Sequence, residues 1–145
     1  MSSIEIREIT AAETWPLRHA VMWPDKPFAY VQLADDDRGT HYGLFENDRL
    51  VSVLSLFVDG ADARFRKFTT LPAYQRRGYG SRLLSHVLEA AARLGARRIW
   101  CSARVEAAPF YGKFGMHESG GRFTHEGMPY VKMEMPLRET LDGRF

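Results

Sequence analysis

The sequence has one cysteine, no long apolar run and no strong excess of either charge. Cys101 has no partner for an internal disulfide, and no group of cysteine and histidine residues has the spacing of a zinc site. The longest apolar stretches have the length of a strand, and the N-terminal segment MSSIEIREIT lacks a hydrophobic signal region. We therefore expect a cytoplasmic protein in a reducing compartment, without a metal and without a membrane partner.

The charge is nearly balanced. Twenty Lys and Arg stand against eighteen Asp and Glu, a formal net charge of +2, so any anion site must be local. The basic segments RFRKF and QRR do not predict a nucleic-acid surface, because alternation sends Phe65 and its neighbouring arginines to opposite faces and the aspartates 35–37 interrupt it. With 145 residues and 45% hydrophobic composition, we expect a single domain, residues 1–145, with its own core.

Hydrophobic periodicity predicts a mixed sheet with helices against it. Thr10 and Glu13 form a capping box before a helix that Pro16 should perturb, and Gly95 suits the end of the longest helix. The tail 138–145 is expected to fray. The expected strands are 4–9, 41–46, 50–58, 63–71, 97–103, 116–123 and 130–137, and the expected helices are 11–23, a short one within 28–34, 81–94 and 108–114.

In the expected strand 63–71, the apolar residues change from one side of the strand to the other. Ala63 and Phe65 share one parity, whereas Phe68 has the other. One extra residue, a β-bulge, would return both groups to the core. An edge strand with loose patterning is the alternative.

The join QRRGYG between this strand and the longest helix is the strongest candidate site. Backbone N–H groups converge there at the positive end of the helix dipole, and Gly78 and Gly80 lack Cβ atoms that would keep a phosphate away. Arg76 and Arg77 add positive charge, so a pyrophosphate fits; a tight turn with solvated arginines is the alternative. Leu83 replaces the third glycine of GxGxxG and no P-loop is present, so neither nicotinamide nor NTP chemistry is indicated.

Two segments together resemble a known family. LPAYQRRGYGSRLL resembles the acyl-CoA-binding signature (Q/R)xxGx(G/A) of the GNAT family of N-acetyltransferases, and APFYGKFGM resembles the AxxFYxKxGF block that follows it about thirty residues later. EGMPYVKM resembles the close of a small bacterial subgroup, with Tyr130 where histidine is commoner, and Arg104 replaces an asparagine that often contacts the cofactor. The matching residues are Gln75, Gly78, Gly80, Ala107, Phe110, Tyr111, Lys113 and Gly115, with Met116 in place of the usual Phe.

The resemblance implies an α/β (α+β) fold with a mixed, mostly antiparallel central sheet of six to seven strands and helices on both faces. It also implies direct transfer of an acetyl group from acetyl-CoA, the cosubstrate, to a primary amine of a small molecule or peptide. A homodimer would be compatible with the fold. The alternative is a non-catalytic acyl-CoA sensor or interaction module.

The resemblance also assigns the cofactor site. The strand edge 68–71 pairs with the pantetheine, a backbone N–H near Leu71 polarises the thioester carbonyl, and the amides of residues 76–81 hold the pyrophosphate. The implied cofactor-binding residues are Phe68, Thr69, Thr70, Leu71, Gln75, Arg76, Arg77, Gly78, Tyr79, Gly80, Ser81, Arg82, Phe110 and Tyr111.

Tyr111 is the expected general acid. A phenol with a pKa of ~10 stays protonated at neutral pH and can give a proton to the leaving thiolate, whose thiol has a pKa of ~8.5. Packing of the tyrosine against the sheet is the structural alternative. Cys101 lies in a strand that should be buried, so we expect a small hydrophobe there and no nucleophile.

The general base is open. The candidates are Glu118, His125 and Glu126, of which Glu126 is taken as the catalytic one, while His41 or a water chain could serve instead. His19 and His86 are expected on helices in contact with solvent. Residues 22–40 and the loop 118–130 should form the acceptor pocket, in which Trp23, Phe28 and Tyr30 either line the pocket or belong to the core.

Overall fold

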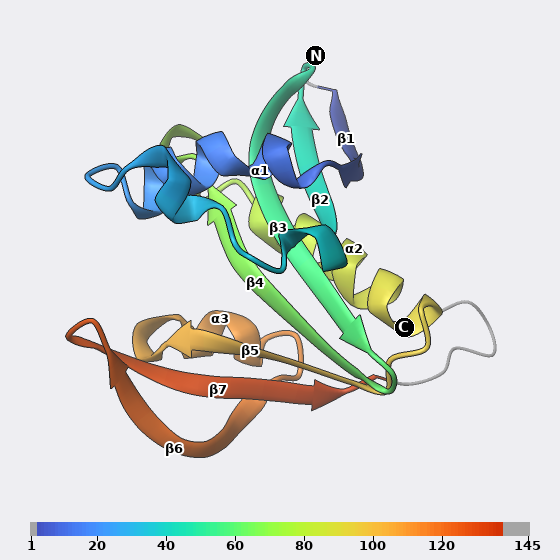
Figure 1. Ribbon diagram of the computed structural model, residues 1–145. Coiled ribbons are helices and arrows are strands. Elements are labelled where there is room, and N and C mark those ends of the chain that lie inside the picture. The colour runs from blue at the N-terminus through green and yellow to red at the C-terminus, as the bar shows by residue number, and fades with distance from the viewer. Residues whose placement is uncertain (1–2, 138–145) are drawn as a thin grey trace. The chain divides into compact units, whose positions relative to one another are not determined.

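The computed structural model describes residues 3–137, and its elements follow the predicted order (Figure 1). The tail 138–145 lies outside the described residues. The elements are β1 (Ile4–Ile9), α1 (Ala11–Leu17), η1 (Arg18–Met22), η2 (Phe28–Val31), η3 (Asp36–Arg38), β2 (Thr40–Glu46), β3 (Arg49–Asp59), β4 (Asp62–Thr70), η4 (Pro72–Tyr74), α2 (Tyr79–Arg93), β5 (Arg98–Arg104), η5 (Val105–Ala107), α3 (Ala108–Gly112), β6 (His117–His125) and β7 (Met128–Pro136).

The strands form a seven-stranded sheet in the order β1-β2-β3-β4-β5-β7-β6. β1 with β2, β2 with β3, β5 with β7 and β6 with β7 pair antiparallel, whereas β4 pairs parallel to β5 through residues 62–64 and 98–100. The predicted mixed, mostly antiparallel sheet is therefore confirmed.

The chain divides into two compact units, each built from two segments of the sequence. Within the described residues, the first unit comprises 3–57 and 67–87, and the second comprises 58–66 and 88–137. The division passes through β3, β4 and α2, so these elements contribute to both units. The single-domain organisation expected from the sequence stays a prediction.

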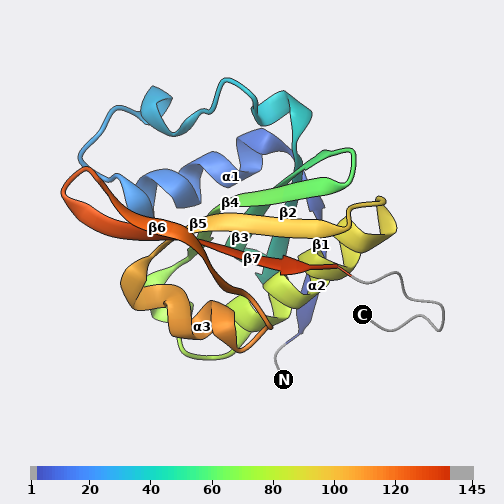
Figure 2. The same ribbon diagram turned by 90° about the horizontal axis from the view of Figure 1, so that it is seen from below.

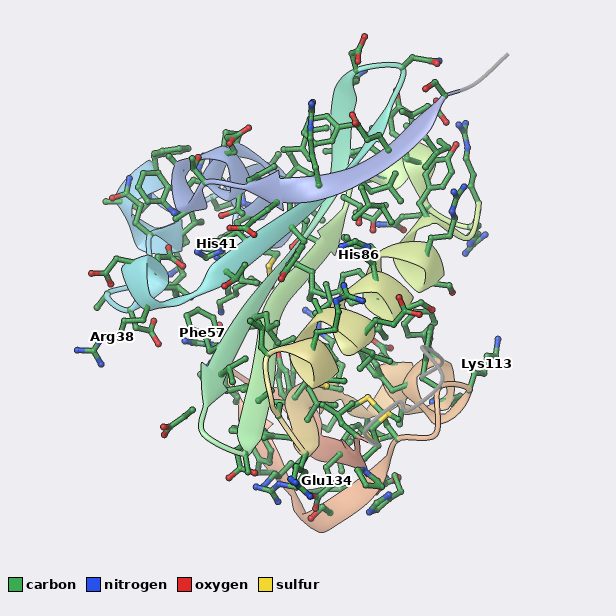
Figure 3. The ribbon with its side chains drawn as sticks, turned by 90° about the vertical axis from the view of Figure 1, so that its right-hand side faces the viewer. Arg38, His41, Phe57, His86, Lys113 and Glu134 are labelled. Atoms are coloured by element: carbon green, nitrogen blue, oxygen red, sulfur yellow. The ribbon has the colours of Figure 1, made fainter. Side chains whose placement is uncertain are left out.

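In the first unit, helical segments cover both faces of β2 and β3. His41 hydrogen-bonds the main chain of η3 through Nε2, whereas the ring of the next residue, Tyr42, meets the edge of His86 from α2 at 5.5 Å between centroids. Successive strand residues point to opposite faces, so η3 and α2 lie on opposite sides of β2. Figure 3 labels His41 and His86. A cluster of Ile9, Leu17, Phe45 and Val53 contributes to the core.

The first helix starts and deforms as its sequence predicts. The Thr10 hydroxyl accepts from the Glu13 amide at 3.2 Å, and the Glu13 carboxylate accepts from the Thr10 amide at 2.9 Å, which completes the capping box. Pro16 lies inside α1, and the chain passes at once into the π-helix η1. Proline supplies no N–H and crowds the preceding turn, which disturbs regular i→i−4 bonding.

The phase slip in β4 coincides with a backbone irregularity. Lys67 has a φ of 58°, a left-handed conformation inside an otherwise extended strand, as a bulged residue can adopt. Ala63 and Phe65 are fully buried, whereas Phe68 is half-buried. The alternative of an edge strand is wrong, because β4 lies between β3 and β5 in the sheet.

In the second unit, α3 lies along one face of β6 and β7 (Figure 2). The predicted alternation in β7 is confirmed, because Val131, Met133 and Met135 are buried between more exposed neighbours, and Leu137 after the strand is buried as well. One face of β7 therefore packs in the core and the other faces solvent, as the sequence indicates.

The apolar stripe of α2 is buried, with one exception at its end. Leu83, Leu84 and Val87 are fully buried, but Leu94 is 55% exposed, contrary to its place in the predicted stripe. Leu94 follows the last helical residue, and Gly95 there turns the chain with a φ of 96°. The Gly95 and Ala96 amides bond back to Ala92 and Ala91, a Schellman cap that confirms the predicted C′ glycine.

Candidate active site

The turn that enters α2 exposes the start of a fifteen-residue helix. Arg76 and Gly78 both have left-handed φ angles, 64° and 80°, and the first helical bond runs from the Arg82 amide to the Gly78 carbonyl at 3.1 Å. The amides of residues 79–81 therefore precede the first intrahelical donor, at the positive end of the helix dipole.

Gly78 is needed for its backbone conformation, not because its surroundings are crowded. A Cβ built on Gly78 would meet nothing within 4 Å, so the space above this turn is open. A residue with a side chain would be strained at this φ and would project into that space. The turn thus combines an unblocked surface with converging donors, which suits an anion.

The turn packs against the end of β4. A Cβ on Gly80 would lie 3.3 Å from Cζ of Phe68, and the Gln75 side-chain amide donates to the Thr70 carbonyl at 3.0 Å. The Thr70 hydroxyl shares a hydrogen bond of 2.8 Å with Ser52 on β3. The structure therefore brings together Phe68, Thr70, Gln75 and Gly80, four of the residues that the sequence assigned to the cofactor.

Hydrogen bonds reveal which edge of β4 faces away from β3. The Leu71 amide donates to the Val51 carbonyl at 2.9 Å, and the Thr69 carbonyl accepts from the buried Ser52 hydroxyl at 3.2 Å. Backbone groups of alternate residues point to opposite edges, so those of Phe68 and Thr70 point away from β3. The Leu71 donor that the sequence analysis assigned to the thioester carbonyl is already engaged within the sheet.

Three arginines lie exposed beside the turn, namely Arg76, Arg77 and Arg82. Arg77 approaches the carboxylate of Glu46, with 3.8 Å between its Nη1 atom and Oε2, and the Tyr79 hydroxyl donates to the same oxygen. The hydrogen bond to this carboxylate is the main cause that raises the pKa of Tyr79 above its ordinary value. Sequence reasoning missed Glu46, which ends β2 and lies 31 positions before Arg77.

Tyr111 lies in α3 within an aromatic group of the second unit. Its ring centroid is 5.8 Å from that of Phe65 and 5.2 Å from that of Phe110. Burial, with a smaller contribution from Cys101, raises the pKa of the Tyr111 phenol above its ordinary value of 10.0. The phenol therefore stays protonated throughout the neutral range and can only donate its proton there.

Cys101 is buried on β5, as predicted. Burial raises the pKa of its thiol to about 12, although the nearby charge of Arg64 opposes the shift. Because the thiolate is the nucleophilic form, this side chain is inert at neutral pH.

The candidate bases of residues 118–130, expected in a C-terminal loop or hairpin, belong to a β-hairpin. Glu126 and Gly127 form its two-residue turn, with φ angles of 51° and 79°, between the long strands β6 and β7. Glu126 and His125 are exposed, and the Glu118 carboxylate pairs with Arg122 at 3.1 Å. The exposed turn leaves Glu126 accessible to solvent.

The histidines of the first unit make contacts within that unit. His41 is buried, and its ring nitrogens contact the Ser55 hydroxyl at 2.7 Å and the Asp36 carbonyl at 2.8 Å, so it is committed to a structural network and does not fit a base. His19 and His86 lie in helical segments but are half-buried. His19 contacts the Lys26 carbonyl at 2.7 Å and His86 packs on Tyr42, so both keep part of the expected exposure to solvent while making these contacts.

The aromatic side chains of residues 22–40 lie outside the core. Phe28 and Tyr30 are 44% and 42% exposed, and Trp23 packs edge-on against Tyr30 at 5.3 Å between centroids. The Lys67 ammonium lies 4.5 Å from the centroid of the Trp23 ring. The sequence left these side chains between core and pocket, and the structure places Phe28 and Tyr30 at the surface.

Residues 3–137 contain neither a cluster of metal-binding side chains nor a helix suited to cross a membrane. In this part of the chain no three or more His, Cys, Asp or Glu side chains gather in a way that could hold a metal ion. Among these same residues, no helix has the length and apolar character needed to cross a membrane.

Solved structures share this fold. A candidate N-acetyltransferase from Lactobacillus plantarum superposes with a TM-score of 0.83 at 24% identity, covering 94% of this chain and 99% of that one. A GNAT family acetyltransferase from Elizabethkingia anophelis, solved with acetyl-CoA bound, gives a TM-score of 0.75 at 16% identity and covers 92% and 98%. The chain therefore shares the fold of these proteins.

Sequence comparison defines the family. The acetyltransferase (GNAT) domain model matches residues 21–137, and the chain belongs to this family of acetyl-CoA-dependent N-acetyltransferases. The [ribosomal protein bS18]-alanine N-acetyltransferase of Escherichia coli K12 is 28% identical over 123 residues, which cover 82% of this chain and 81% of the relative. An N-acetyltransferase of Bacillus pumilus is 33% identical over 94 residues, 57% of this chain and 56% of the relative.

Proposed function

We propose that the protein transfers an acetyl group from acetyl-CoA directly to a primary amine of a small molecule or peptide. The observation that carries the proposal is the open turn at residues 76–81, which matches the family signature and packs against the end of β4. The bS18-alanine acetyltransferase among the relatives makes a peptide with N-terminal alanine one acceptor to test.

The diphosphate of acetyl-CoA would lie on the amides of residues 79–81, with Arg76, Arg77 and Arg82 around it. The pantetheine would pair with the edge of β4 that carries the backbone groups of Phe68 and Thr70. Because the Leu71 amide is engaged with Val51, we assign polarisation of the thioester carbonyl to the Thr70 amide on the free-facing edge.

Tyr111 would protonate the leaving group. The neutral amine attacks the thioester carbonyl carbon, the C–S bond breaks, and the thiolate of CoA takes the phenolic proton. This role rests on the FY pair of the second family block, and the phenol is protonated at neutral pH, where it can act as the donor. Solvent returns the proton to Tyr111 after each turnover.

For the proton that the attacking amine loses, we propose Glu126 as base. Its position at the exposed hairpin turn allows proton exchange with bulk water. Glu126→Gln should lower kcat at pH 7 and make the rate rise more steeply with pH, since fewer amines are then deprotonated by the protein. Glu89→Gln, an exposed carboxylate on α2 paired with Arg93 at 3.9 Å, is the matched control. Equal rates in both variants would remove Glu126 from the mechanism.

Calorimetry with acetyl-CoA, combined with release of free CoA in the presence of a panel of amines, tests the function. The panel contains an alanyl peptide, a polyamine, an amino sugar and a free amino acid. We expect binding and acceptor-dependent thiol release with at least one of them. Tight binding without turnover on any amine would favour the non-catalytic sensor, and absence of binding would overturn the cofactor site.

A further inference from the structure

Glu46 stands beside the positive turn that the proposed function assigns to the diphosphate, and no role is given to it by the family motifs. It is the last residue of β2, where it is paired with Ile4 of β1 and Arg49 of β3, so its backbone is fixed from both sides. Its side chain is only 13% exposed. This carboxylate is therefore built into the first unit at a defined position and is not a mobile surface group.

Two residues of the turn meet this carboxylate through one oxygen. The Tyr79 hydroxyl donates to Oε2, and Nη1 of Arg77 lies 3.8 Å from the same atom. Tyr79 is the first residue of α2, while the Arg77 side chain is 51% exposed and its pairing is loose. The first contact fixes the start of the helix, and the second holds a cation that could instead face a ligand.

We propose that Glu46 is an internal counter-ion that lowers the affinity of this turn for coenzyme A. This role of Glu46 rests on the proposed function, which places the diphosphate at residues 76–81. A carboxylate near the start of α2 is stabilised by the same helix dipole and the same arginine that would hold a diphosphate. Glu46 and the ligand therefore compete for the charge of Arg77.

The competition lowers the affinity for acetyl-CoA and for CoA alike, because both molecules carry the diphosphate. An enzyme that binds its product less tightly releases it sooner, so Glu46 favours release of CoA after transfer. Tyr79 is a separate contact: an amide oxygen at position 46 would still accept its hydroxyl. Glu46→Gln therefore removes the charge and keeps the hydrogen bond that fixes the start of α2.

The test is calorimetric titration of CoA into the full-length wild type, Glu46→Gln, Arg77→Gln and the double variant. We expect Glu46→Gln to bind CoA roughly two- to tenfold more tightly, the range for a partly screened charge pair. The gain should shrink at high ionic strength and should be absent when Arg77→Gln is the background. Thermal unfolding and circular dichroism verify that each variant is folded.

Glu134→Gln is the matched control. Its carboxylate, labelled in Figure 3, is 14% exposed and pairs with Arg98 at 2.7 Å in the second unit, and we expect no change in CoA affinity. Equal or weaker binding by Glu46→Gln while the wild type binds CoA would overturn the counter-ion role alone. A gain that persists without Arg77 would also overturn it. Absence of CoA binding by the folded wild type would overturn both this role and the proposed function.

Discussion

Replacing Asp36 should destabilise the first unit more than any exposed substitution. Its carboxylate accepts from both terminal nitrogens of Arg18 at 2.9 and 3.0 Å, from the Trp15 indole at 3.0 Å and from the Leu33 amide at 2.9 Å. Arg18 is fully buried and also donates to the Ser55 hydroxyl and the Val31 carbonyl. The pair connects η1, η3 and β3.

Asp36→Asn keeps the shape of the side chain but leaves a buried guanidinium without a counter-charge. Breaking one partner of a buried pair costs about 3–5 kcal/mol, a large part of a typical 5–15 kcal/mol stability. With a urea dependence of roughly 2 kcal/mol per molar, the unfolding midpoint should fall by about 2 M. Asp37→Asn, an exposed neighbour in the same turn, should change stability by less than about 0.5 kcal/mol.

Urea unfolding followed by circular dichroism measures the difference. A double change to Arg18→Met and Asp36→Leu should recover much of the loss, because an apolar pair carries no desolvation penalty. A loss of stability for Asp36→Asn no larger than that for Asp37→Asn would refute the argument that the pair holds this segment.

The same carboxylate predicts an acid limit. Burial opposes ionisation of Asp36, but hydrogen bonds from Arg18, Trp15 and Leu33 and the charge of Arg18 outweigh it and lower its pKa below 3.8. A carboxyl whose pKa is lower in the folded state than in the unfolded state stabilises the fold. This stabilisation is complete at pH values above the unfolded-state pKa and is lost as the pH falls through the folded-state pKa. Wild type should therefore lose this contribution only below pH 3.8, and Asp36→Asn should not show that loss.

Three further substitutions test the site. Tyr111→Phe should lower kcat about 100-fold and change the Kd for acetyl-CoA much less, and an unaltered kcat would rule out the general acid. Gly78→Ala should raise the Kd for acetyl-CoA about tenfold in calorimetry, while Gly60→Ala, at a similar φ of 62° and equally open, should cost similar stability without affecting binding. Cys101→Ala should retain turnover, and native Cys101 should resist iodoacetamide at neutral pH because its thiol pKa is about 12.

The elements could be predicted from the sequence because their signals are local. Thr10 and Glu13 lie three residues apart and form their capping box, and the stripe through Leu83 and Val87 is buried. Leu94 was wrongly placed in the buried stripe because the helical spacing of apolar residues continues one position beyond Arg93, the last residue of α2. Gly95 then turns the chain away. A hydrophobic pattern records which face is buried, but it does not mark where the helix stops.

The candidate site likewise has features that the sequence predicts and others that it does not. Gly78 is required by its backbone conformation and Gly80 packs closely on Phe68, and such local requirements leave a short motif that can be recognised in the sequence. The Leu71 assignment could not be checked from the sequence, because the direction of its amide depends on pairing with Val51, 20 positions earlier. The segment 118–130, expected as a loop or hairpin, forms a hairpin because Glu126 and Gly127 turn the chain within two residues.

The side chains that hold residues 24–40 in place form no recognisable pattern in the sequence. Asp36 reads as one of three consecutive aspartates, yet it alone of the three is buried, against an arginine 18 positions earlier and beneath His41. Because the Asp36 carbonyl can only accept, His41 donates from Nε2, and its Nδ1 atom shares a hydrogen bond with the Ser55 hydroxyl, which also accepts from Arg18. Each member of this network is positioned by partners from other elements of the fold. Long-range polar pairing of this kind stabilises the segment that carries Phe28 and Tyr30 at the surface, while the residues that do so remain indistinguishable from ordinary loop charges in the sequence.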